Sequence, residues 1–338
     1  MKEKSKKTTK RVIITILLIL LLFIAAVFAF AWNKLGLLQY DDGTVDDMDV
    51  AVEDVSEENI LSEEDLEGLV ILDGEPVIPN MDIYDDKNVV NILLIGTDER
   101  TKQFNTNARS DSMILISINK DKDTVKLVSL ERGMGVPVLS GQYEGQYDWL
   151  THIFRYGGAD LLMETVETCF RVKVDKYVRV NFNTLTQIVD SIGGVEIALT
   201  AEEASYMSSY YDVKTGTNLF NGNEALFYSR IRKIDSDWGR VVRQRNVIQS
   251  AFMAAKGMSL VEINTAVNEI LPLIQTNLTK AEIAALIIEA PSLVGKEMDQ
   301  ITVPKKGTYG GMTGMGGRSL FAVDFTANAE ILQEFLYS

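Results

Sequence analysis

The run Val-Val-Asn-Ile-Leu-Leu-Ile-Gly-Thr-Asp fills residues 89–98, and Asn91 is the only polar residue among its first seven. A nearly continuous apolar run of this length is typical of a strand whose two faces are both buried. Gly96 and Thr97 end the run, so Asp98 directly follows the strand. We therefore expect the folded domain to begin here, with a carboxylate at the end of its first strand.

Two further strands are predicted at residues 113–118 and 124–130. Because the connections are short, the first strand runs up, the second runs down and the third runs up again. The polar residues at the strand ends then meet at one edge of one sheet, where α/β proteins place active sites. In the alternative interpretation the aspartates are ordinary loop acids. The edge residues are Asp98, Arg109, Asp111 and Arg132.

A second stretch, residues 228–245, reads Tyr-Ser-Arg-Ile-Arg-Lys-Ile-Asp-Ser-Asp-Trp-Gly-Arg-Val-Val-Arg-Gln-Arg. Residues two apart share one face of an extended segment, and residues three or four apart share one face of a helix. An acidic corner between the two parts is placed where a helix N-cap is expected. The residues expected to converge are Arg230 and Arg232 from the extended part, and Arg240, Arg243 and Gln244 from the helix.

Clustered guanidinium groups match the geometry of phosphate oxygens, and a helix N-terminus adds oriented N–H groups. Aspartates beside a phosphate would repel it unless a hard cation lies between them. Mg²⁺ is such a cation, since it binds carboxylate oxygens and phosphate oxygens together. Alternatively, the stretch is a surface helix whose arginines pair with its own aspartates.

The overall composition limits the partners and the kinds of catalytic site that this chain can have. The formal net charge is −15, and no long basic stripe is present, which argues against nucleic acid as a partner. Cys169 is the only cysteine and His152 the only histidine. A disulfide framework and most nucleophile–histidine arrangements are therefore excluded, and the composition argues against a zinc site. Any catalysis must come from carboxylates, arginines and a hard metal ion.

The first 88 residues divide into three segments. Residues 1–11 are basic, and residues 12–32 carry no charge and are long enough to span a bilayer as a helix. Ala-Phe-Ala at 29–31 resembles a signal-peptide cleavage site, but the apolar run is longer than such peptides use, which favours an uncleaved anchor. The basic flank then stays in the cytoplasm and the rest lies outside the membrane. Residues 33–88 are an acidic spacer, and residues 89–338 form the domain.

Coarser patterns complete the domain. Strands are predicted at 176–182, 195–199, 301–303 and 319–323. Helices are predicted at 159–170, 184–192, 201–211, 247–256, 260–275, 279–290 and 327–337. Residues 307–317 are rich in glycine and methionine without a P-loop ending, which predicts a mobile loop.

Several motifs then occur in the order of a known family. They are Asn-Ile-Leu-Leu-Ile-Gly-Thr-Asp (91–98), Arg-Ser-Asp-Ser-Met (109–113), Val-Ser-Leu-Glu-Arg (128–132), Gly-Gly-Val-Glu-Ile (193–197), Asn-Gly-Asn-Glu-Ala-Leu-Phe-Tyr-Ser-Arg-Ile-Arg (221–232) and Asp-Ser-Asp-Trp-Gly-Arg-Val-Val-Arg-Gln (235–244). The chain resembles the LytR-CpsA-Psr family of bacterial cell-envelope proteins from about residue 89 to its end.

The resemblance implies a three-layer α/β/α fold with a central mixed sheet. It also implies a Mg²⁺-dependent phosphotransferase outside the cytoplasmic membrane, with Mn²⁺ as an alternative metal. Such enzymes take a glycopolymer, typically wall teichoic acid or capsular polysaccharide, from a polyprenyl (pyro)phosphate carrier. They attach it to peptidoglycan through a phosphodiester, when a hydroxyl of an amino sugar attacks the phosphorus that bears the polymer.

Motif positions imply the roles of individual residues. Asp98 and Asp111 would hold the metal, and with Arg132 and Arg240 they would form the catalytic set. Asp237 would orient the arginines, and Asp111 is also a candidate base. The pyrophosphate would be held by Arg109, Arg132, Arg230, Arg232, Arg240 and Gln244, to which we add Arg243 from the same helix.

Two positions depart from the family pattern. Glu131-Arg132-Gly133 stands where the family usually has Pro-Arg-Asp, and Trp149 stands where a lysine is common. Two alternatives to a transferase therefore remain open. One is a polyprenyl-pyrophosphate hydrolase with water as acceptor, and the other is a regulator that binds the lipid-linked phosphate without turning it over.

Overall fold

A computed structural model describes the folded domain around one central sheet. The order of the seven strands is β1-β10-β7-β2-β3-β4-β11. The described residues are 39–40, 76, 78–99, 104–105, 108–256, 258–259, 262, 265–266, 269–283, 285–286 and 298–338. The sheet strands are β1 (Gln39–Tyr40), β2 (Val89–Thr97), β3 (Ser110–Asn119), β4 (Thr124–Leu130), β7 (Lys176–Asn181), β10 (Gln275–Thr276) and β11 (Asp299–Val303).

The middle of the sheet has the expected directions. β2 pairs antiparallel with β3, and β3 pairs antiparallel with β4. β7 runs parallel to β2 and β11 runs parallel to β4, so the sheet is mixed, as predicted. The end of β2, the start of β3 and the end of β4 therefore lie at the same edge.

Alternation along β2 divides its side chains between two cores. Leu93 and Ile95 pack into the larger hydrophobic cluster with α3 (Leu150–Phe170) and α10 (Phe325–Tyr337). Ile92 packs on the opposite face, in the cluster that includes Ile248 and Phe252 of α7 (Asp237–Ala255). Both faces are buried, which explains the nearly continuous apolar sequence of the strand.

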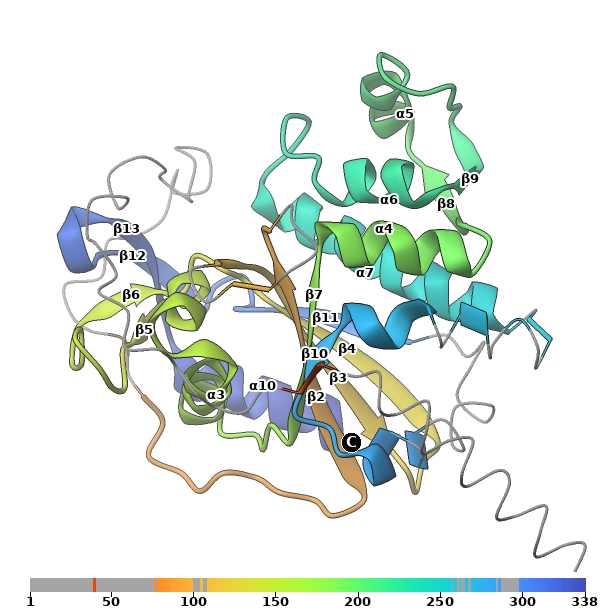
Figure 1. Ribbon diagram of the computed structural model, residues 1–338. Coiled ribbons are helices and arrows are strands. Elements are labelled where there is room, and N and C mark those ends of the chain that lie inside the picture. Colours follow the sequence, from red (N-terminus) through yellow and green to blue (C-terminus); the bar gives the residue numbers. More distant parts are fainter. Residues whose placement is uncertain are drawn as a thin grey trace, which may run out of the picture.

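Helices cover both faces of the sheet, giving three layers (Figure 1). α3 and α10 lie on one side, and α4 (Phe182–Ser191), α6 (Gly222–Ser229) and α7 lie on the other. The smaller elements are β8 (Val195–Leu199), α5 (Ala201–Met207) and β9 (Gly216–Phe220) above α6, then β5 (Gly135–Pro137), β6 (Tyr147–Trp149), η3 (Leu271–Leu273), β12 (Tyr309–Thr313), η4 (Met315–Gly317) and β13 (Ser319–Val323).

Several local predictions were wrong in detail. The glycine-rich segment at 307–317 contains β12, which pairs antiparallel with β13, so it is not a free loop. α3 begins at Leu150 and bends at Gly157 and Gly158, whereas we predicted a helix only from residue 159. The helix start expected at the acidic corner is confirmed, because α7 begins at Asp237 with Ser236 as its N-cap and continues to Ala255, so the helix predicted separately at 247–256 is its C-terminal part. The predicted helix at 260–275 ends in the sheet strand β10.

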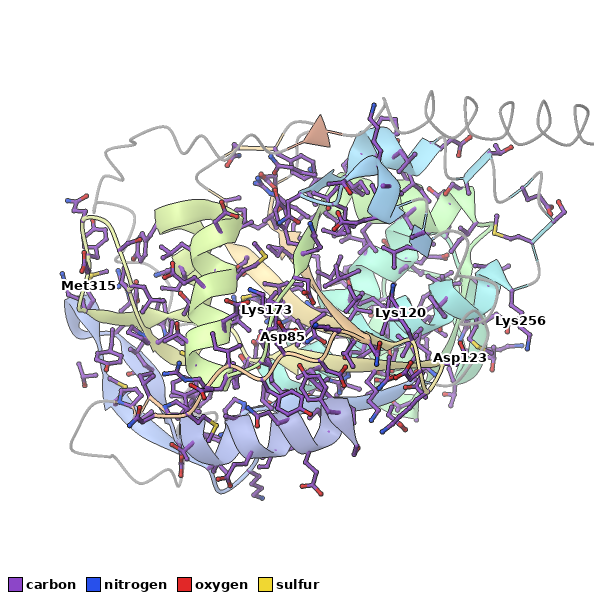
Figure 2. The ribbon with its side chains drawn as sticks, turned by 90° about the horizontal axis from the view of Figure 1, so that it is seen from below. Asp85, Lys120, Asp123, Lys173, Lys256 and Met315 are labelled. Carbon is purple, nitrogen blue, oxygen red and sulfur yellow. The ribbon has the colours of Figure 1, made fainter. Side chains whose placement is uncertain are left out.

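The domain also begins earlier than residue 89. Tyr84 forms a parallel bridge with Val172, and its N–H donates to the carbonyl of Arg171 at 2.8 Å. Asp85 lies beside Lys173 on this side of the molecule (Figure 2). The pKa of Lys173 is raised chiefly by the hydrogen bond that its ammonium donates to Glu167, and the negative charge of Asp85 adds to this effect. Residues 78–88, which we assigned to the spacer, are therefore packed on the domain.

The predicted cytoplasmic tail and membrane anchor, residues 1–32, lie outside the described residues, and so does most of the spacer. Among the helices that the structure does describe, none combines the length and the apolar character needed to cross a bilayer.

The contact between α4 and α6 predicts a steric effect at Gly222. A Cβ at this position would lie 2.2 Å from the carbonyl oxygen of Thr186 in α4. Gly222→Ala should therefore lower the free energy of unfolding by about 1–3 kcal/mol, measured by urea denaturation. Gly311→Ala is the control, because a Cβ there meets no atom within 4 Å. Equal stability of the two variants would contradict the close approach of the helices.

Candidate active site

A cavity of about 620 Å³ opens at the sheet edge on the face covered by α4, α6 and α7. One part of its lining is charged and the other is apolar. The charged and amide-bearing part consists of Asp98, Arg109, Asp111, Asn181, Arg230, Arg232, Arg240 and Gln244. The apolar part includes Leu94, Val180, Phe182, Leu185, Leu226, Phe227, Val247 and Ile248.

The two aspartates from the strand ends both line this cavity. Asp98 accepts from the backbone N–H of Arg109 at 3.2 Å and from its Nε at 3.3 Å. Asp111 accepts from Nη1 of Arg132 at 3.0 Å. Burial alone would raise the pKa of Asp111, but the charges of Arg132, Arg240 and other arginines outweigh it, so the pKa lies below its ordinary value. Asp111 is therefore anionic at neutral pH.

Asp237 lies behind the cavity and links the arginines. Its carboxylate accepts from Nε of Arg132 at 3.0 Å and from Nη2 of Arg240 at 2.6 Å. Nε of Arg232 lies 3.8 Å from the same carboxylate. Asp237 is the first residue of α7, where the helix dipole favours a negative charge. Asp237 therefore fixes the side chains of Arg132 and Arg240 relative to each other.

Arg132 is placed differently from the prediction. It is 4% exposed and does not belong to the cavity lining. Its guanidinium joins Asp111 to Asp237 instead. In this structure Arg132 supports the site from behind rather than reaching into the space available to a ligand.

Three other predicted residues do face the cavity. Arg232 has 43% of its side chain exposed, and burial together with the positive charges of Arg132 and Arg240 lowers its pKa to about 10. Arg230 lies over the ring of Phe182, with its Cζ 4.3 Å from the ring centroid. Gln244 accepts from the hydroxyl of Ser112 at 2.9 Å.

Arg243 is a correction to the predicted set. Its guanidinium donates to Glu203 at 2.8 Å, to Asp235 and to the carbonyl of Ile231, and it lies outside the cavity lining. The sequence placed it on the face of Arg240, but its guanidinium is held by Glu203 of α5 and by Asp235, which precedes α7. The prediction that Arg230 lies in an extended segment was also wrong, because Arg230 caps the C-terminus of α6.

The donor chemistry of the cavity fits a divalent cation such as Mg²⁺. Asp98 and Asp111 keep 29% and 18% of their side chains exposed. Mg²⁺ in proteins commonly uses one or two carboxylates and completes its shell with water and phosphate oxygens. Within the described part of the chain, no group of three His, Cys, Asp or Glu side chains could hold a metal. Asp98 and Asp111 would therefore hold such an ion together with ligand oxygens.

Two features of the site were not predicted. The residues of the apolar lining were not named in advance, although alternation along β2 places Leu94 on the cavity face. Glu131 was noted only as a departure from the family pattern, and its burial was not predicted. It is 0% exposed. Burial and the negative charge of Asp237 raise the pKa of Glu131 to about 8. Trp149, the other departure, packs against Leu320 and does not line the cavity.

The buried acid predicts a pH dependence of stability. Since the pKa of Glu131 rises from 4.5 to about 8 on folding, its stabilising contribution is complete below pH 4.5 and is lost as pH rises through 8. Glu131→Gln cannot ionise. Relative to wild type, the variant should gain stability between these pH values, by on the order of a few kcal/mol. Urea denaturation at several pH values tests this, and parallel pH profiles of the two proteins would contradict it.

Comparison with known proteins agrees with the motifs. The chain is 35% identical over 203 residues to the polyisoprenyl-teichoic acid–peptidoglycan teichoic acid transferase TagU of Oceanobacillus iheyensis, covering 58% of this chain and 59% of the relative. It is 34% identical over 232 residues to biofilm regulatory protein A of Streptococcus mutans, covering 63% and 55%. The matches thus span less than two thirds of these relatives.

Solved structures share the fold. TagT bound to LIIa-WTA superposes with a TM-score of 0.59 and 26% identity, covering 79% of this chain and 98% of that chain. The model of the LytR_cpsA_psr family matches residues 57–335. The match starts before β2, in agreement with the packing of residues 78–88 on the domain. The chain therefore belongs to the LytR-CpsA-Psr family.

Proposed function

We propose that this protein transfers a glycopolymer from a polyprenyl diphosphate carrier to peptidoglycan and forms a phosphodiester link. The observation that carries the proposal is one cavity that joins a cationic rim to an apolar interior. A lipid-linked diphosphate has the same two parts. The names of TagU and of the TagT complex support the same substrate class.

The charge balance of the rim suits a diphosphate. Arg109, Arg132, Arg230, Arg232 and Arg240 face or back the rim, whereas the carboxylates are those of Asp98, Asp111 and Asp237. Five guanidinium groups against three carboxylates leave an excess of two positive charges. The lowered pKa values of Arg232 and Arg240 arise from burial and then from like charge, which an anion would relieve.

The apolar part suits the polyprenyl chain. It lies between β2 and β7 on one side and the helices α4, α6 and α7 on the other. Leu94 and Val180 contribute from the sheet, and Leu185, Leu226 and Ile248 contribute from the helices. Burying prenyl carbons there removes apolar surface from water and contributes to binding.

In the proposed reaction, a hydroxyl of a peptidoglycan amino sugar attacks the phosphorus that carries the polymer. A P–O bond to the acceptor forms, the P–O bond to polyprenyl phosphate breaks, and the hydroxyl proton is released. The arginines stabilise the charge on the diphosphate oxygens, which is the main source of rate in phosphoryl transfer. The lowered pKa of Asp111 makes it a weak proton acceptor, so we assign it a charge-holding role rather than that of base.

Mg²⁺ or Mn²⁺ on Asp98 and Asp111 would supply further neutralisation of the diphosphate oxygens. We also propose that residues 12–32 anchor the protein, with residues 1–11 in the cytoplasm and the domain outside the membrane. The polymer would be teichoic acid or a capsular polysaccharide.

Arg232 and Lys233 offer a matched test of the rim, because both are exposed neighbours and only Arg232 lines the cavity. The full chain in detergent is given a polyprenyl diphosphate-linked sugar, Mg²⁺ and a peptidoglycan oligomer. Arg232→Ala should reduce transfer about tenfold or more by removing a phosphate contact, and Lys233→Ala should not. Sugar-linked peptidoglycan and polyprenyl phosphate are measured by mass spectrometry.

The products separate the alternatives. Release of polyprenyl phosphate with sugar phosphate in water, and no linkage to peptidoglycan, would instead establish a hydrolase. Binding without turnover on any acceptor would support the regulator. An equal loss of activity in both variants would contradict the assignment of Arg232 to the rim.

The apolar part predicts a difference between lipid and inorganic ligands. Leu226→Trp places a larger side chain in the part lined by Leu185 and Phe227. It should weaken binding of polyprenyl diphosphate by about tenfold or more while leaving binding of inorganic pyrophosphate unchanged, because only the former fills that space. Calorimetric titration of both ligands checks this. Equal weakening for both would place the lipid elsewhere.

A further inference from the structure

Arg179 is a buried arginine that lies on the side of the sheet away from the cavity. It pairs with Ile95 in the register of β7 and β2, and it is 4% exposed. Its neighbour Val180 lines the cavity, so by alternation Arg179 points to the opposite face. Its guanidinium indeed lies over the ring of Phe154 in α3, with Cζ 4.7 Å from the ring centroid. Arg179 therefore does not contact a ligand in the cavity.

The guanidinium instead contacts the described residues of the connection between β2 and β3. Nη2 of Arg179 donates to the carboxylate of Glu99 and to the carbonyl of Asn105, and Nη1 donates to Gln275 at 2.9 Å. The ring of Phe104 lies over the guanidinium, again with its centroid 4.7 Å from Cζ. The plane of the group is thus covered by an aromatic ring from α3 and by one from the connection itself.

Glu99 also links the two sides of the connection through its own carboxylate. Its Oε1 accepts from the backbone N–H of Asn105 at 2.8 Å, and its Oε2 accepts from the hydroxyl of Thr97. Glu99 is 6% exposed and directly follows Asp98. The connection ends at Arg109, whose N–H donates to Asp98. Asp98 is therefore held between a residue fixed by Arg179 and the other end of the same connection.

We propose that Arg179 and Glu99 form a clamp that positions the Asp98 carboxylate at the cavity rim from the far side of the sheet. The proposal rests on the function proposed above for the role of Asp98, but the clamp itself is a statement about this chain alone. Arg179 is a positioning residue because it acts through Glu99.

The geometry requires an arginine rather than any cation. One planar fork reaches the Glu99 carboxylate, the Asn105 carbonyl and Gln275 while lying between two rings. A lysine has one ammonium group on a flexible stem and cannot reproduce these directions. A buried ion pair contributes little stability by itself, since desolvation offsets much of its attraction. We therefore assign to this arrangement the role of holding Glu99 and Asn105 together.

Hydrogen exchange on the full chain in detergent tests the clamp without any turnover. In Arg179→Lys, the amides of Asn105 and Arg109 should exchange about tenfold faster or more, because their acceptors Glu99 and Asp98 are no longer fixed. Arg318→Lys is the matched control, since Arg318 is 6% exposed, pairs with Asp148 and lies over the ring of Trp149. The control should leave both amides unchanged. Glu99→Gln serves as second variant if Arg179→Lys does not fold.

Kinetics give the second readout. In Arg179→Lys, kcat should fall by about 10- to 100-fold through misplacement of Asp98, while the Kd for polyprenyl diphosphate stays within about twofold. Unchanged exchange at both amides, or the same increase in Arg318→Lys, would overturn the clamp. If wild type shows no turnover, the proposed function fails while exchange still decides on the clamp. Faster exchange with unchanged kcat in an active enzyme would overturn its positioning role.

Discussion

The shared carboxylate of Asp237 is the interaction on which the site depends. Arg132 and Arg240 are both buried, and both donate to Asp237. Without a negative charge between them, two desolvated guanidinium groups would repel each other in a medium of low dielectric. Through Arg132 the same network reaches Asp111 on β3, so the start of α7 is connected to two strands of the sheet. The helix thereby stays over the sheet edge and the cavity beneath it stays open.

The two sides of the sheet contribute in different ways. On the cavity side, Leu94 and Val180 provide apolar surface next to charged strand ends. On the other side, Leu93, Ile95 and Arg179 pack toward α3, where they are buried from solvent. The alternating side chains of β2 and β7 therefore supply both the wall of the cavity and the support of its rim.

The strand ends could be predicted from sequence because short connections leave few arrangements. The predicted directions of β2, β3 and β4 were confirmed, and with them the common edge of Asp98 and Asp111. The helix residues were harder to assign. Arg243 and Gln244 are adjacent in sequence and therefore point about 100° apart on a helix. Glu203 and Asp235, which hold Arg243, come from other parts of the chain and have no local signal. Likewise, β12 forms only because β13 pairs with it, which its glycines do not indicate.

The departure from the family pattern at Glu131-Arg132-Gly133 has a consequence for charge. An aspartate at Gly133 would add a carboxylate near the arginines, and Glu131 does not replace that charge, because its pKa of about 8 keeps it neutral at neutral pH. The rim thus keeps its full positive excess. Such an excess opposes folding when the cavity is empty and is relieved when an anion binds. Since a ligand that binds only the folded state stabilises it by mass action, part of the stability of this site is expected to come from an anionic ligand. The loss at Gly133 is therefore consistent with a site that depends more strongly on its anionic ligand, rather than with one that has lost its function.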